Sequence, residues 1–418
     1  MKSNKKEPTT SAPTILRLIN GQKKLHLHNV IFFALFFAFG LLSGLGVGLY
    51  LSNISFTFQL RQFSISKSGP GGGSPVLIRR SDPPPSAWHE MGEEELLWRA
   101  SMVPRVPEFP FHRVPKVAFM FLTVGALPLA PLWELFFKGG DDGLYTIYIH
   151  SLPSYDNATA DFPVGSVFYG RRIPSKDVQW GKSTMVGAER RLLANALLDF
   201  SNERFVLLSE SCIPLYNFTT IYNHLINSPE SHVEVYDQLG PVGRGRYNPA
   251  MDPVIKLAHW RKGSQWFEMD RRLAVEVVSD RTYFPTFEKF CNGSCYGDEH
   301  YLPTLVNIRF GGWNSNRTLT WADWSVRGPH PRSFWRPDVT VGFLEGLRDG
   351  GKCEEYGKSV GVAAGGGIGV HYYVNRNNKS DSSGGTGDRG SKCFLFARKF
   401  RSHSLTRLLR FAPGVMQF

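Results

Sequence analysis

The sequence has no compact run of lysine and arginine and no recognisable nucleic-acid-binding motif, although its formal net charge is +12. A basic balance of this size is compatible with nucleic acid, an anionic membrane or a phosphorylated substrate as partner. Because the positive charge is scattered, nucleic acid ranks last, and we expect none. Cysteine is also scarce. There are five cysteines in 418 residues, so at least one stays unpaired if the others form intramolecular disulfides.

Charge is absent from one long stretch near the N-terminus. Residues 30–51 form an uncharged run rich in Phe, Leu and Gly, long enough to cross a bilayer core of about 30 Å as a helix. Residues 1–29 carry six lysines and arginines against Glu7 alone. The positive-inside rule then predicts a cytosolic tail, a transmembrane signal anchor and a lumenal remainder. The alternative is a cleaved signal peptide, whose apolar core spans only ~7–15 residues.

Sequons and cysteines agree with a lumenal chain. The six Asn-x-Ser/Thr sequons are at Asn53, Asn157, Asn217, Asn292, Asn316 and Asn378. The secretory pathway also permits disulfides. From spacing and compartment we predict disulfides Cys291–Cys295 and Cys353–Cys393, which leave Cys212 free.

Composition divides the rest of the chain. Residues 52–115 are rich in Gly, Pro and Ser and are predicted to be a flexible stem, with one short helix at 93–99. Residues 116–411 are predicted to be the lumenal globular domain. Within it, residues 357–392 are low in complexity and indicate a disordered insertion.

Strands and helices alternate at the start of this domain. Apolar runs predict strands at 116–123, 144–150 and 204–208, with a short one at 166–169. Amphipathic runs predict helices at 131–138 and 185–200. This order predicts an α/β domain with a mostly parallel central sheet. Further along, the pattern predicts a strand at 233–236, helices ending at 278 and starting near 299, a strand-like run at 393–400 and a closing helix at 405–411.

Polar residues follow two of the predicted strands. Ligands of open α/β sheets bind beyond the carboxyl ends of strands. His150 and Ser151 follow one such strand, and Ser209 and Glu210 follow another. These four residues are therefore candidates for ligand binding, although ordinary polar loops also follow strands.

Other candidates lie in the second half of the domain. Arg244, Arg246 and Tyr247 form a loop suited to a sugar or an anion, and a solvated basic loop is the alternative. Trp266 has an aromatic face for a sugar ring, or it belongs to the core. Glu299 follows a turn between two cysteines. It is either a general base at a pocket mouth or an ordinary acidic residue at a helix N-terminus.

Six segments, in this order, resemble the plant branch of the Core-2/I-branching β-1,6-N-acetylglucosaminyltransferase family. The segments are Tyr145–Pro153, Leu207–Leu215, Gly243–Pro249, Trp260–Trp266, Asp298–Thr304 and Cys393–Phe400. The resemblance covers residues 116–411 apart from the Gly-rich insertion. It implies a GT-A-like fold, a UDP-sugar donor, and inverting transfer to a hydroxyl of a glycan or glycoprotein. It also implies a type II protein of the Golgi membrane with a lumenal catalytic domain.

The resemblance also assigns roles to residues. It implies that Glu299 is the general base and that Lys399, with Arg398 beside it, contacts the donor diphosphate. The remaining donor-side candidates are His150, Ser151, Ser209 and Glu210. Animal members carry His-Val-Asp where this chain has His150-Ser151, which is a departure from the family pattern. The resemblance implies acceptor contacts at Glu234, Arg244 and Arg246, and Tyr247 and Trp266 are added as acceptor-side candidates from their own chemistry.

No Asp-x-Asp motif occurs, although many GT-A enzymes hold a metal with one. The only adjacent aspartates, Asp141 and Asp142, precede the second predicted strand. Fixed positive charge from Lys399 and Arg398 replaces the metal in this interpretation, so we expect no cofactor. Two alternatives stay open. A glycoside hydrolase needs a second carboxylate, for which Glu210 is the candidate, and a non-catalytic lumenal sugar-binding protein needs none.

Overall fold

The computed structural model describes residues 35–40, 43, 86–106, 109–155, 162–326, 328–348 and 392–418. Contacts divide the chain into two units, Met1–Arg80 and Ser81–Phe418. Among the described residues, no helix is long and apolar enough to cross a membrane. The predicted anchor at 30–51 lies mostly outside these residues, as does nearly all of the predicted insertion at 357–392.

The second unit is built around a four-stranded sheet. Its strands are β1 (Lys116–Leu122), β2 (Tyr145–His150), β3 (Asn202–Ser209) and β5 (Glu268–Asp270). The order is β2-β1-β3-β5, with β1 parallel to β2 and β3, and β5 antiparallel to β3. The structure thus confirms an α/β fold with a mostly parallel sheet.

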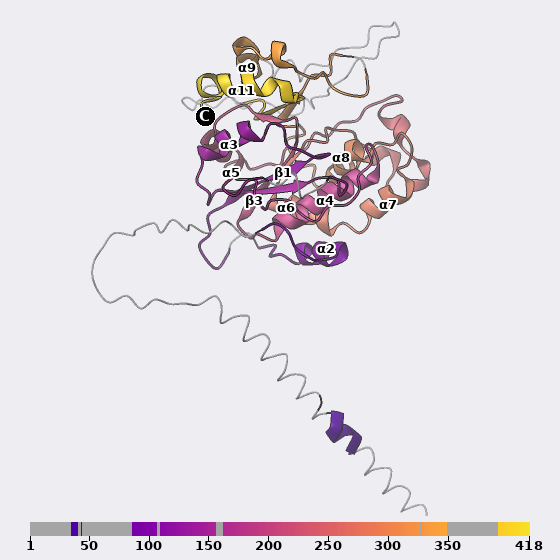
Figure 1. Cartoon of the computed structure of the whole chain (residues 1–418). Helices are drawn as coiled ribbons and strands as arrows, with labels where there is room; N and C mark the ends of the chain where they lie inside the picture. The colour runs from indigo at the N-terminus through magenta and orange to yellow at the C-terminus, as the bar shows by residue number, and fades with distance from the viewer. Residues whose placement is uncertain are drawn as a thin grey trace, which may run out of the picture. The chain divides into compact units, whose positions relative to one another are not determined.

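Helices cover both faces of this sheet (Figure 1). Alternate side chains of β1 enter opposite cores, with Phe119 and Phe121 in one and Met120 and Leu122 in the other. The first core is filled by helices α3 (Ala130–Lys138), α5 (Phe218–Ile226), α9 (Val341–Arg348) and α11 (Leu405–Phe411). The second is filled by helices α2 (Glu93–Ser101), α4 (Ser183–Leu197), α6 (Arg271–Ser279), α7 (Tyr283–Phe290) and α8 (Gly297–Arg309).

Helix α2 confirms the short helix predicted at 93–99, but it lies in the globular unit. Its Leu96 and Ala100 are buried in the second core. The backbone N–H of Ala87 also donates to the carbonyl of Gly170 at 2.8 Å. The globular unit therefore begins within the segment predicted as stem.

A second, three-stranded sheet brings the C-terminal segment to the carboxyl end of β3. Its strands are β4 (Ile213–Pro214), β7 (Phe396–Arg398) and β6 (Thr320–Ala322), in the order β4-β7-β6. Strand β4 starts four residues after β3 ends, and β7 pairs with it. The run predicted as strand-like at 393–400 therefore contains β7.

Two predicted strands are wrong. Residues 166–169 form turns, because Gly165 and Gly170 on either side have φ of 104° and 64°. Residues 233–236 form no strand. The neighbouring His232 makes an isolated bridge to Glu268, and the last residue of the segment, Tyr236, makes another to Lys262. The segment is held at one point to β5 and at another to the chain before β5, instead of along a continuous ladder.

Candidate active site

A cavity of about 660 Å³ lies beyond the carboxyl ends of the parallel strands. Leu122 and Thr123 from the end of β1 and Ser209 and Glu210 from the end of β3 line it. The other walls come from the loop before α4, residues 234–246, residues 262–266, the start of α8, and β6 and β7 with the loop after β6. Its volume falls in the range typical of small-ligand sites, roughly 300–1,000 Å³.

Glu299 lies in the first turn of α8 and lines this cavity. The N-cap residue, Tyr296, makes no side-chain capping hydrogen bond to the helix. The Glu299 carboxylate instead accepts from Arg246 Nη1 at 2.6 Å and lies 3.0 Å from Lys262 Nζ. Its partners are therefore cavity-wall cations, which disfavours the helix-cap interpretation.

The surroundings of Glu299 keep it ionised. Burial alone would raise the pKa of this carboxyl, but Lys262 and Arg246 outweigh burial and hold its pKa below the usual range. At neutral pH the group is therefore a carboxylate. Only the carboxylate form accepts a proton, so this state is the one that a general base requires.

Two neighbouring carboxyl groups have raised pKa values, in contrast to Glu299. Burial and the charge of Glu299 raise the pKa of Asp298 to about 6. Burial, opposed by Lys262, raises the pKa of Glu234 to about 7. Both groups line the cavity. Near neutral pH they are protonated part of the time, so Glu299 carries the persistent negative charge of this wall.

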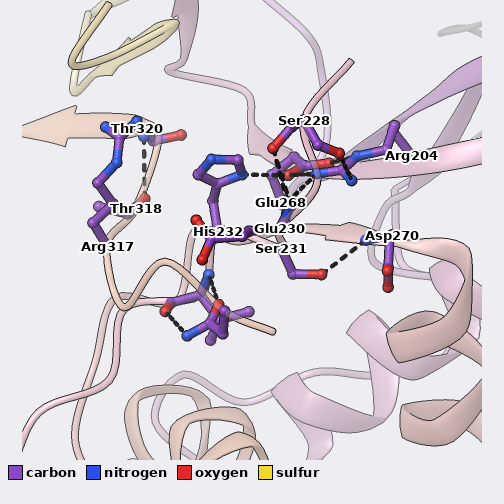
Figure 2. A network of polar contacts seen from close by, with 12 residues as sticks. Arg204, Ser228, Glu230, Ser231, His232, Glu268, Asp270, Arg317, Thr318 and Thr320 are labelled. Carbon is purple, nitrogen blue, oxygen red and sulfur yellow. Dashed lines mark hydrogen bonds and ion pairs between the residues drawn. The ribbon is translucent and has the colours of Figure 1, made fainter. Parts of the chain in front are cut away.

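A buried polar network fixes the segment that presents Glu234 (Figure 2). Arg204 of β3 donates to both carboxylate oxygens of Glu268, at 2.6 and 2.7 Å, and to the carbonyl of Glu230 at 2.6 Å. His232 Nδ1 contacts the same carboxylate at 2.8 Å. Residues 230–232 are thereby tied to β3 and β5, and Glu234 follows two residues later.

Gly263 lets the two acidic segments approach each other. Its N–H donates to the carbonyl of Glu299 at 2.9 Å. A Cβ added at this position would lie 1.8 Å from the carbonyl oxygen of Glu234 and 2.8 Å from Pro303 Cγ. No side chain fits in this space, so the position requires glycine.

Arg398 and Lys399 supply positive charge on the β7 wall of the cavity. Neither side chain lies within 4.0 Å of a carboxylate oxygen of a described residue. The Arg398 guanidinium is 4.1 Å from the centre of the Trp266 ring. Burial, followed by repulsion from Arg398 and Arg401, lowers the pKa of Lys399. An anionic ligand would relieve this repulsion.

The other predicted donor-side residues divide into two pairs. Ser209 and Glu210 line the cavity. His150 and Ser151 do not line it, and their donor-side role stays a prediction. His150 is fully buried with Nε2 3.2 Å from Arg191 Nη1, and burial together with Arg191 lowers its pKa to about 3. The Ser151 hydroxyl accepts from Arg172 at 2.6 Å.

Three of the predicted acceptor-side residues also have structural partners. Arg244 donates to Asp237 at 2.8 Å and does not line the cavity. Tyr247 likewise lies off the wall, since its hydroxyl donates to the carbonyl of Ile255 at 2.7 Å. Trp266 lines the cavity, but it is 7% exposed and Arg398 covers its ring. The ring of Trp266 therefore packs against the Arg398 guanidinium.

Several residues that line the cavity were not predicted from the sequence. Lys262 lies inside a motif, but its pairing with Glu299 depends on the bridge between residues 236 and 262. Trp180 and Tyr296 come from separate loops. The motif Trp260–Trp266 was the one sequence feature that pointed to Lys262, and no sequence pattern relates Trp180 to Tyr296.

Cysteine pairing agrees with the prediction as far as it is described. Cys291 and Cys295 form a disulfide with an S–S distance of 1.98 Å. Cys212 is free and buried. Cys393 is disulfide-bonded, and its predicted partner Cys353 lies outside the described residues. Across the described part of the chain, no group of three or more His, Cys, Asp or Glu side chains is arranged to hold a metal ion.

Comparison with known proteins identifies the class. Residues 117–348 match the family model described as Core-2/I-branching enzyme. The chain is 34% identical over 327 residues to glycosyltransferase BC10 of Oryza sativa subsp. japonica, covering 70% of this chain and 76% of that protein. The protein is a glycosyltransferase. It belongs to the Core-2/I-branching enzyme family, on the plant side of that family.

One solved structure is also similar. It is the galactosyltransferase LgtC in complex with donor and acceptor sugar analogues. The match has a TM-score of 0.27 and 8% identity, and it covers 46% of this chain and 71% of that one. A similarity at this level adds nothing on substrates.

Proposed function

We propose that this glycosyltransferase has a GT-A-like fold and moves a sugar from a UDP-sugar to a hydroxyl of a glycan or glycoprotein, with inversion at the anomeric carbon. One observation carries the proposal. An ionised carboxylate, Glu299, and two cations without described carboxylate partners, Arg398 and Lys399, line the same cavity. A single displacement needs a base for the nucleophile and positive charge for the leaving group.

The proposed step assigns each group one task. The acceptor O–H bond breaks as its proton passes to the Glu299 carboxylate, and the oxygen bonds to the anomeric carbon. The bond between that carbon and the diphosphate oxygen breaks, and UDP leaves with the electron pair. Lys399 and Arg398 stabilise the charge that grows on the diphosphate. Arg246 and Lys262 hold Glu299 in place.

Acceptor binding is proposed for two of the predicted residues. Glu234 and Arg246 line the cavity next to Glu299. A carboxyl group and a guanidinium offer hydrogen bonds to sugar hydroxyls. On the donor side, Ser209 and Glu210 lie at the end of β3, and the charge of Glu210 acts on Lys399.

The function is tested with radiolabelled UDP-GlcNAc, UDP-xylose and UDP-galactose. Purified protein is incubated with each donor and a mixture of plant wall oligosaccharides and arabinogalactan glycoprotein. Label that moves onto an acceptor supports the proposal. Cleavage of an unlabelled oligosaccharide without transfer would indicate a hydrolase, and sugar binding without turnover would indicate a lectin.

Metal independence is proposed because Lys399 and Arg398 supply the charge that a metal would otherwise provide. We expect transfer to persist in EDTA. We expect Lys399→Ala to weaken UDP binding and turnover together, by roughly 10–100-fold, because a charged hydrogen bond contributes about 1.5–3 kcal/mol. Lys256→Ala, at an exposed position off the cavity, is the matched control. An enzyme silenced by EDTA and restored by Mn²⁺ would contradict the proposal.

We also propose that the protein is a single-pass type II protein of the Golgi membrane, without a nucleic-acid partner. The basic tail, the uncharged run at 30–51 and the sequons support this topology. A tag at residue 1 should be digested by protease added to sealed Golgi vesicles, whereas a tag at residue 418 should be protected. The opposite pattern would refute the topology.

A further inference from the structure

An aromatic pair lines the cavity, and the chemistry proposed above does not use it. The ring centres of Trp180 and Tyr296 are 5.2 Å apart, with the planes at 69°. Trp180 is 51% exposed although it belongs to a cavity wall. A large aromatic surface is thus open to whatever enters from this side.

The backbone around this pair is closely fixed. Gly181 has φ of +72°, and a Cβ there would lie 2.8 Å from Tyr296 Cδ1. Tyr296 itself has φ of 54°, which is uncommon for a bulky residue. It follows the disulfide between Cys291 and Cys295 and precedes α8. Backbone of this kind persists only where its surroundings impose it, and such positions cluster at ligand sites.

The pair is joined to the proposed base by one side chain. The Arg246 guanidinium lies 4.2 Å from the centre of the Tyr296 ring and donates to Glu299 at 2.6 Å. An acceptor hydroxyl has to reach Glu299. The part of the acceptor next to the reacting sugar then extends along Arg246 and Tyr296 to Trp180.

The chemistry of this wall suits a sugar ring. A pyranose has an apolar C–H face and a rim of hydroxyl groups. Trp180 and Tyr296 offer aromatic surface, while Arg246 and Glu234 offer polar groups on the same cavity. The cations suited to a diphosphate are Arg398, the last residue of β7, and Lys399, which follows it.

We propose that Trp180 and Tyr296 form a subsite for the sugar residue adjacent to the one that reacts, so that the preferred acceptor is an oligosaccharide or polysaccharide chain. This inference rests on the proposed function and specifies the acceptor class. The acceptor must contain at least two sugar units, one bound next to Glu299 and one on the ring of Trp180.

The test compares acceptors of increasing length. The full chain, purified in detergent, is assayed with the donor set used above against β-1,3-galacto-oligosaccharides and β-1,4-xylo-oligosaccharides of one to four residues. We expect kcat/KM to rise from the monosaccharide to the longer acceptors. In Trp180→Ala the ratio of kcat/KM for the longer acceptors to kcat/KM for the monosaccharide should fall about tenfold. This is the effect of losing an aromatic contact of about 1.5 kcal/mol.

Two further variants keep the test decisive. Trp180→Phe preserves an aromatic face and should restore most of the length dependence. Trp313→Ala is the matched control, because Trp313 is also 51% exposed but lies off the cavity, 3.4 Å from the Arg272 guanidinium. It should behave like the wild type.

Other results would overturn the subsite. If no oligosaccharide reacts better than its monosaccharide, or if Trp180→Ala keeps the full length dependence, the inference fails. Loss of UDP affinity in Trp180→Ala would assign the pair to the nucleotide instead. Calorimetric UDP binding separates this failure from failure of the proposed function, in which the wild type itself would neither bind UDP nor transfer sugar.

Discussion

Replacing Glu299 with glutamine is expected to lower turnover about 10²–10⁴-fold, the usual contribution of a general base. Glutamine keeps an oxygen that can accept from Arg246 and Lys262, the two partners of Glu299. It has no basic carboxylate to take the acceptor's proton. UDP affinity, measured by calorimetry, should change little because other residues, Arg398 and Lys399 above all, are proposed to bind the donor.

The pH dependence of turnover gives a second readout. Lys262 and Arg246 hold the pKa of Glu299 below its usual range, against the opposing effect of burial. The proton-accepting role of Glu299 should therefore persist as pH falls toward the ordinary carboxyl range and be lost only below it. The ion pairs of Glu299 also stabilise the fold above its unfolded pKa, and this contribution is lost as pH falls through the lowered folded pKa.

Glu345→Gln is the matched control for this substitution. Glu345 is an exposed carboxylate on α9 and lies off the cavity. Its replacement should leave turnover and its pH profile unchanged. A folded Glu299→Gln protein that works at nearly the wild-type rate would return Glu299 to a structural role.

Replacing Gly263 with alanine is expected to damage both the fold and the site. The added methyl group would lie 1.8 Å from the carbonyl oxygen of Glu234, so the backbone must move. Overpacking of this kind costs about 1–3 kcal/mol. The movement displaces Glu234 and, through the N–H that bonds the carbonyl of Glu299, the proposed base as well. A shift of about 1 Å at a reacting group costs about 10²-fold in rate.

The control for Gly263 is Gly346→Ala. Gly346 lies in α9, and a Cβ there meets nothing within 4 Å. Alanine in a helix is about 0.5–1 kcal/mol more stable than glycine, so the melting temperature should hold or rise. Thermal unfolding and transfer are measured for both variants. Wild-type stability and turnover in Gly263→Ala would show that residues 234 and 263 are not packed as described.

The parts of the fold that local patterns determine were predicted correctly. Strands β1, β2 and β3 are apolar runs, and helices α3 and α4 are amphipathic, so their positions follow from periodicity. Strand β5 has three residues and no pattern of its own. It is a strand through its pairing with β3, and Arg204, 64 residues away, also holds its Glu268.

The candidate site was predictable where its residues lie in motifs. Glu299 and Lys399 were both expected to contact substrates, and the structure places them on one cavity. The neighbours that tune Glu299 depend on tertiary contacts. Lys262 reaches it through the pairing of residues 236 and 262, which no local pattern indicates.

The predicted residues that lie off the cavity also depend on tertiary contacts. His150 follows a strand, as a ligand-binding residue would, but its ring contacts Arg191 of α4 and is buried. Arg244 and Arg246 are two residues apart in one loop, yet one pairs with Asp237 and the other with Glu299. Which arginine faces the cavity depends on the 3₁₀ turn at Arg244–Arg246, and composition does not determine it.

The most direct test of the account is the anomeric configuration of the product. With a UDP-α-sugar and an acceptor that the enzyme uses, a single displacement assisted by Glu299 forms a β-linkage. The coupling constant of the new anomeric proton in the NMR spectrum distinguishes the two anomers. We predict a β-linked product from the wild type and the same product, formed far more slowly, from Glu299→Gln. An α-linked product would contradict the inverting mechanism and the role of Glu299 as its base.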